Sequence, residues 1–144
     1  MNEPHKTNGE SDLDKIVRSL KPERNEGEFV FCSVLSLQSI DLTKIVLFFT
    51  EREGYTVVLK KQVADELQLP YSFVAAWITL TVHSSLEAVG LTALFSTALA
   101  NRNISCNVVA AAFHDHIFVG VHQADEAMEI LNGLANGRRD NELR

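Results

Sequence analysis

The residue types that could bind a small anion gather where a helix is predicted to begin. Ser84, Ser85 and Glu87 flank this start, and Gly90 falls in the first turns of the helix. Backbone N–H groups in a first helical turn lack intrahelical partners, and together with the helix dipole they attract an anion such as a carboxylate. The same serines also suit a simple helix cap, with Glu87 as a complement to the dipole, so the residues leave both interpretations open.

Gly90 itself has two explanations. A glycine inside a helix costs about 1 kcal/mol relative to alanine. Close approach of a ligand or of a neighbouring backbone would account for it, and so would close packing of the helix against a sheet.

A second group of chemically capable residues is His114-Asp115-His116. Imidazole and carboxylate groups are common ligands of first-row metals, but a site here would need a third ligand such as His83 or His122. Alternating side chains in a β-turn point apart. We therefore expect no metal and no other cofactor, with Asp115 forming the turn and the histidines lining an edge or an interface.

The remaining polar and nucleophilic residues do not form a recognisable catalytic motif. In the predicted strand, the side chain of Asn107 points to the face opposite that of Cys106. A buried amide there must find hydrogen-bond partners in the backbone or in a ligand. Cys32 and Cys106 lie in apolar runs, where a reduced thiol behaves as a small core residue. No phosphate loop, zinc-ligand spacing or nucleophile elbow occurs, and the neighbours His83 and Ser84 are not a triad without spatial geometry. The sequence thus predicts no catalytic residue and a protein that is not an enzyme.

Composition narrows the function further. The 144 residues are 46% hydrophobic and 22% charged, which is typical of a folded globular protein. The formal net charge is −6, and the only basic clusters are Lys60-Lys61 and Arg138-Arg139, so we expect no nucleic-acid partner. No apolar run is long enough to cross a membrane and the polar N-terminus has no signal-peptide core, so we expect no membrane association and a cytoplasmic location.

The elements of the first half are short. Residues 1–10 are polar and predict a disordered lead-in. A helix is predicted over 12–20, a strand over 28–35, a β-hairpin over 44–59 and a helical turn or two over 62–67. Pro70 restricts Leu69, and the segment that it begins is the best internal boundary.

The second half predicts the order β-α-β-β-α. A strand with alternating apolar residues covers 77–83, a helix covers 86–101, strands cover 104–111 and 116–121, and a last helix follows from 124 to 135. Residues 136–144 are polar and predict a frayed tail. Such a split βαβ unit packs two helices on one face of an antiparallel sheet and leaves the other face or the edges free.

This pattern resembles the ACT domain, a small ferredoxin-like fold of amino-acid-sensing proteins, and the whole chain resembles stand-alone bacterial proteins with two ACT-like halves. The strings that carry the resemblance are Ser11-Asp-Leu-Asp14, Gly27-Glu-Phe-Val-Phe-Cys32, Leu69-Pro-Tyr71, His83-Ser-Ser-Leu-Glu-Ala-Val-Gly-Leu91, Ile104-Ser-Cys-Asn-Val-Val109 and His114-Asp-His116. The resemblance implies an α+β, ferredoxin-like βαββα(β) sandwich with antiparallel sheets, an ACT-like half over 11–70 and an ACT domain over 71–135.

The resemblance also implies a function. It indicates a regulatory or sensor protein, a homodimer, that binds a small molecule, an amino acid above all, and catalyses nothing. The residues expected to contact the ligand are Ser84, Ser85, Glu87, Val89, Gly90, Leu91, Asn107, Val108, His114, Asp115 and His116. Two alternatives stay open: a protein–protein interaction module of the same fold without a small ligand, and a metal-dependent enzyme built on the histidines.

Overall fold

The computed structural model describes residues 9–81 and 89–142. All strand pairs are antiparallel, and they form a seven-stranded sheet in the order β3-β4-β2-β5-β7-β6, with β1 also paired to β5. The elements are α1 (Gly9–Arg18), β1 (Lys21–Arg24), β2 (Phe29–Val34), β3 (Ile45–Glu51), β4 (Gly54–Lys60), α2 (Lys61–Glu66), β5 (Val74–Thr81), α3 (Leu91–Ala100), β6 (Asn107–Ala110), β7 (Asp115–Gly120) and α4 (Ala124–Glu142).

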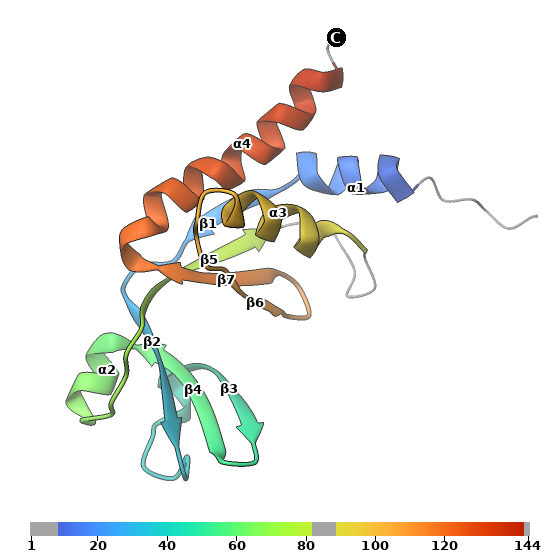
Figure 1. The fold of residues 1–144 in the computed structure, drawn as a ribbon. Helices are drawn as coiled ribbons and strands as arrows, with labels where there is room; N and C mark the ends of the chain where they lie inside the picture. Colours follow the sequence, from blue (N-terminus) through green and yellow to red (C-terminus); the bar gives the residue numbers. More distant parts are fainter. Residues whose placement is uncertain (1–8, 82–88, 143–144) are drawn as a thin grey trace, which may run out of the picture.

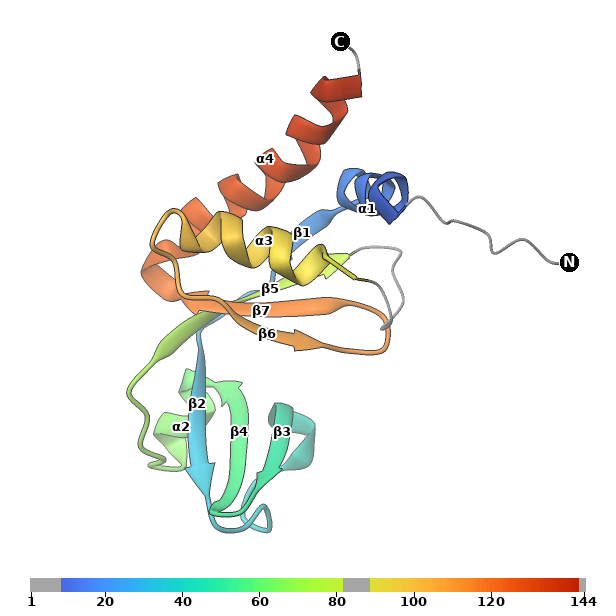
Figure 2. The same cartoon turned by 45° about the vertical axis from the view of Figure 1, so that its right-hand side comes forward.

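The second half confirms the predicted β-α-β-β-α order and the α+β class. α3 and α4 cover one face of β5, β7 and β6, and Figures 1 and 2 show the two helices above these strands. Alternation in the strands places Ile78 and Leu80 of β5 beside Ile117 of β7, and all three are fully buried against Phe95 and Leu131 of the helices. This cluster is the larger core of the protein.

The first helix and strand also belong to this core. β1 pairs with β5 from Lys21↔Thr81 to Arg24↔Ile78, and Val17 and Leu20 are buried among the side chains of α3, α4 and β5. The segment 9–24, which the sequence places in the first half, therefore packs in the second. β1 was not predicted, because its four residues are mostly polar and include Pro22.

The rest of the first half forms a smaller unit below this sheet (Figure 1). β2, β4 and β3 make a curled sheet with α2 on one side, and Val30, Val57 and Leu59 form a second core there. β2 and β5 share only two residue pairs, Phe29↔Ala75 and Val30↔Val74. The sheet bends at this junction, where Phe29, Phe118 and Val58 form a third cluster.

Several element boundaries differ from the predicted ones. α3 begins at Leu91 because Gly90 adopts φ +98°, a left-handed conformation that an α-helix cannot include. β6 begins at Asn107, since Asn103 at φ +58° ends α3 and Ile104 donates its N–H back to Leu99 O at 3.0 Å. α4 continues to Glu142, past the predicted end at residue 135. Within the described residues, no helix is both long and apolar enough to span a membrane.

Candidate functional site

The start of α3 is the first part of the candidate site. Gly90 is the N-cap residue and offers no side-chain hydrogen bond to the first turn, so among the described residues the N-cap position leaves the first backbone N–H groups without a capping side chain. Val89 before it is 89% exposed, whereas Leu91 after it is buried. A Cβ on Gly90 would lie 3.3 Å from Leu13 Cδ2, so α1 packs closely over this position. Ser84, Ser85 and Glu87, like His83, lie outside the described residues.

The turn between β6 and β7 lies at the same end of the sheet. Figures 1 and 2 both show α3 beginning where β5 ends and where this turn projects. Residues paired across strands share a face, so Asp115 opposite Leu80 and Val108 opposite Ile117 face the helices. Partial burial raises the pKa of the Asp115 carboxyl, and the charge of His116 lowers it by less.

Asn107 and His116 lie on the opposite face of the same strands, and His114 comes directly before β7. Asn107 pairs with Phe118 and donates its Nδ2–H to the backbone oxygen of Phe118 at 3.3 Å. His114 and His116 are two residues apart, and their rings lie 6.3 Å apart, edge to face. The sheet thus divides the predicted contact residues into a helix-side group, Leu91, Val108 and Asp115, and a group on the helix-free face.

His116 is fixed in one tautomer by its neighbours. Trp77 Nε1 donates to His116 Nδ1 at 2.9 Å, and Thr79 Oγ1 lies 3.1 Å from the same nitrogen. Because an indole N–H can only donate, Nδ1 is the unprotonated nitrogen and Nε2 carries the proton. Asn25 Nδ2 in turn donates to Thr79 Oγ1 at 2.9 Å. Burial lowers the pKa of His116, the nearby His114 lowers it further, and Asp115 opposes both.

The titratable and thiol groups near these strands can be compared with what a metal site requires. No group of three His, Cys, Asp or Glu side chains with metal-binding geometry occurs in the described parts of the chain. Among the described residues, the buried Nδ1 atom of His114 has no hydrogen-bond partner. Cys32 and Cys106 are free thiols, and burial raises the pKa of both, that of Cys106 to about 11, so neither is a thiolate at neutral pH.

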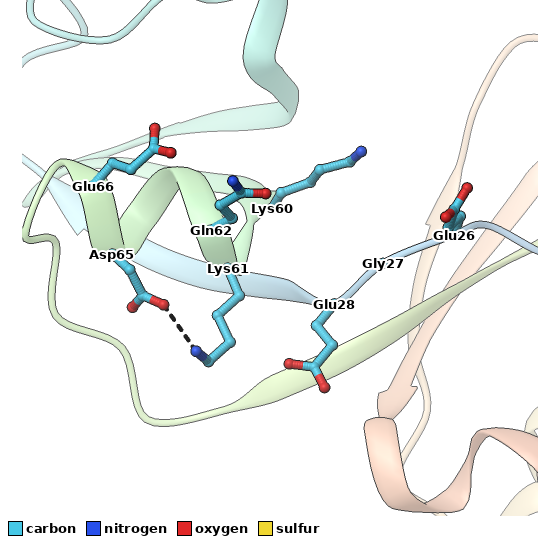
Figure 3. A pocket seen from close by; sticks show the side chains of 8 residues that line it. All are labelled: Glu26, Gly27, Glu28, Lys60, Lys61, Gln62, Asp65 and Glu66. Atoms are coloured by element: carbon cyan, nitrogen blue, oxygen red, sulfur yellow. Dashed lines mark hydrogen bonds and ion pairs between the residues drawn. The ribbon is translucent and has the colours of Figure 1, made fainter.

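Two surface hollows lie where the sheet bends, and the sequence patterns indicated neither. One, of about 590 Å³, is lined only by polar and charged side chains and Gly27. Figure 3 shows that Lys61 turns to Asp65, to which it is paired at 2.8 Å, while Lys60 extends away from this pair. The residues that line this hollow are Glu26, Gly27, Glu28, Lys60, Lys61, Gln62, Asp65 and Glu66.

The other hollow, of about 690 Å³, combines apolar and charged groups. Its walls come from the link between β1 and β2, the start of β3, the region where β4 meets α2, and Trp77 of β5. These segments are distant in sequence, so no pattern of residue spacing could predict that they lie together in the fold. The lining residues are Asn25, Glu26, Phe29, Thr43, Lys44, Ile45, Val46, Lys60, Val63 and Trp77.

Comparisons with known proteins place this fold in a family. Two family models, both described as ACT domain, match residues 8–76 and 72–133. A Vibrio cholerae protein of solved structure, described as of unknown function and a possible transport protein, is 43% identical, with 88% of this chain and 98% of that one covered and a TM-score of 0.79. No curated protein sequence matches the chain.

More distant solved structures share the fold alone. A putative C-terminal regulatory domain of aspartate kinase from Porphyromonas gingivalis is 12% identical, covers 81% of this chain and 96% of its own length, and gives a TM-score of 0.53. The regulatory subunit of aspartate kinase from Thermus thermophilus, in a ligand-free form, is 7% identical, with 80% and 95% covered and a TM-score of 0.53.

Proposed function

The chain belongs to the ACT-domain family, and from this premise we propose that it is a regulatory protein that binds an amino acid where α3 begins. ACT domains are regulatory modules rather than catalytic ones. The observation that carries the proposal is the start of α3, where a left-handed Gly90 occupies the N-cap position and, within the described residues, offers no side chain to the first backbone N–H groups. An amino acid's carboxylate fits such a helix start.

The helix-side group supplies the other contacts that an amino acid needs. Asp115 lies at the same end of the sheet, and its carboxylate would pair with the ligand's ammonium group. Because burial raises the pKa of Asp115, a cation beside it would favour the charged carboxylate and oppose that shift. Val108, which is only partly buried, offers apolar surface to the ligand side chain.

A thermal-shift screen against the twenty amino acids tests this proposal. A ligand at 100 times its dissociation constant stabilises the folded state by about 2.7 kcal/mol, which raises the melting temperature by roughly 5–10 °C. Asp115→Asn should reduce the shift, whereas Glu129→Gln, an equivalent change on the exposed face of α4, should preserve it. If no amino acid changes the melting temperature or the oligomeric state, the proposal is wrong.

One observation favours a second role, association of two copies through β3. This strand is the edge of the smaller sheet, and it carries Phe48 and Phe49, which are 49% and 67% exposed. An apolar edge strand presents unpaired N–H and C=O groups that another strand can pair with. We propose an antiparallel β3–β3 contact in a homodimer, in which the two-fold axis brings identical residues together.

Light scattering on a sizing column tests this contact. Phe49→Lys should shift the protein to monomer, since it places a charge on the paired edge, whereas Leu35→Lys, at an 87% exposed position after β2, should leave the dimer intact. A monomeric wild-type protein would contradict the contact. A dimer that shows no amino-acid response would favour the interaction module without a small ligand.

A further inference from the structure

The apolar and charged hollow at the bend of the sheet has its own structural cause. β1 and β2 pair in succession with the same side of β5, and the chain leaves the sheet between them. Asn25 continues the contact by donating its backbone N–H to Trp77 O at 2.9 Å, and Gly27 at φ +103° then redirects the chain. The chain therefore loops away from β5 between Asn25, which contacts Trp77, and Phe29, which pairs with Ala75.

Three charged side chains line this hollow. In the described part of the chain, Glu26, Lys44 and Lys60 form no ion pair within 4.0 Å. The charge of Lys44 lowers the pKa of the nearby Asp41 carboxyl, but by less than the hydrogen bonds from Thr43 do. The hollow thus combines two ammonium groups and one carboxylate, all available to a ligand.

The floor of the hollow is apolar and rigid. Phe29 is buried and meets Trp77 edge to face, with ring centroids 5.4 Å apart. The Trp77 indole is held in place by its hydrogen bond to His116. Ile45, Val46 and Val63 complete the apolar lining. A mainly apolar surface with a few convergent polar groups is typical of small-molecule sites. The neighbouring hollow of Figure 3 has no apolar side chain, and its Lys61 is already paired with Asp65.

We propose that this hollow is a second ligand site and that it takes an α-amino acid with an apolar side chain. Lys44 and Lys60 would hold the carboxylate, Glu26 would pair with the ammonium group, and the side chain would lie against Phe29 and Trp77. This site goes beyond the proposed function, because its Trp77 lies on the face of the sheet away from α3 and α4 and it shares no residue with the start of α3.

Trp77 is the only tryptophan of the chain, so its fluorescence reports directly on this site. We expect titration with leucine to change the emission saturably. Lys44→Gln and Lys60→Gln should each raise the dissociation constant by about tenfold or more, as expected for loss of a charge-assisted hydrogen bond. Lys15→Gln, on the exposed side of α1, is the matched control and should leave the dissociation constant unchanged.

Two further variants test the role of Glu26 and the independence of the two sites. Glu26→Gln should remove the preference for leucine over its α-keto acid, which lacks the ammonium group. Asp115→Asn should leave the fluorescence titration unchanged, even where it reduces the thermal shift that reports on the start of α3. Melting curves without ligand check that each variant folds.

The outcomes are distinguishable. If leucine, isoleucine, valine and methionine all leave Trp77 emission unchanged, the second site does not exist, whatever the thermal-shift screen shows. If Lys44→Gln and Lys60→Gln bind as tightly as wild type, the hollow is not the site. A response lost in Asp115→Asn but kept in the lysine variants would assign the signal to the start of α3 and would also overturn this proposal.

Discussion

Replacing three glycines by alanine should change the free energy of unfolding in opposite directions. Gly133 lies inside α4, and a Cβ there would meet no atom within 4 Å. Alanine is about 1 kcal/mol more favourable than glycine in a helix, so Gly133→Ala should stabilise the protein by about that amount. Gly90 has φ +98°, where an L-residue costs about 1–2 kcal/mol. Gly90→Ala should therefore destabilise.

The contacts refine these magnitudes. At Gly90 the closest atom to a new Cβ is the terminal Leu13 Cδ2 at 3.3 Å, which can move, so strain in the backbone dominates the cost. At Gly54 the new Cβ would lie 2.5 Å from the backbone oxygen of Val34, and relief requires β4 to shift relative to β2. We expect the order of stability to be Gly133→Ala, wild type, Gly90→Ala, Gly54→Ala.

Urea denaturation of the purified variants measures this order. The Gly133→Ala and Gly90→Ala proteins should differ by about 2–3 kcal/mol, the sum of the two effects. At about 2–4 °C for each kcal/mol, their melting temperatures should differ by roughly 4–12 °C. A Gly90→Ala protein as stable as wild type would refute the left-handed start of α3, and with it the geometry on which the amino-acid site depends.

Three other perturbations test the packing and electrostatics. The pKa of His116 is lowered from 6.5. As the pH falls below 6.5, the unfolded state therefore binds a proton more readily than the folded state does. The free energy of unfolding then decreases by at most about 1.4 kcal/mol for each pH unit. His116→Asn keeps an acceptor for Trp77 but cannot titrate, so urea melts between pH 7.5 and 5 should show a smaller loss; an identical loss would refute the assignment. Phe95→Ala removes a fully buried ring and should cost about 3–5 kcal/mol in the same assay. A fragment of residues 71–144 should lack a cooperative melt in circular dichroism, because β1 and α1 complete its sheet and core.

Local sequence patterns predicted the second half well because its elements are long and periodic. Strand alternation around Ile78 and the apolar stripe that includes Phe95 were sufficient for the β-α-β-β-α order and for the helix-covered face. β1 shows the limit of this approach. Its residues carry no apolar alternation, and only pairing with β5 makes them a strand, with Pro22 opposite Leu80. Tertiary pairing of that kind has no local signal.

The candidate site was predictable in part. The importance of Gly90 was evident in the sequence, but its role as the residue before α3, rather than within it, depends on a φ angle that composition does not reveal. The separation of Asp115 from its flanking histidines follows from the two-residue period of a strand once β7 is known to begin at Asp115. The hollow at the bend combines segments that meet because the chain turns at Gly27 between β1 and β2, so no motif could indicate it.

One continuous segment connects the two proposed sites. α1 packs over the start of α3 through Leu13, and the chain then runs along β5 as β1 and reaches Asn25 and Glu26 at the rim of the hollow. We expect a ligand that shifts α1 to shift the rim of the hollow as well, because both belong to one segment of the chain. Coupling between two sites is reciprocal, so a ligand in the hollow would change affinity at the start of α3 by the same factor. Residues 9–24 thus link the core of the second half, in which they pack, to the rim of the hollow at the bend.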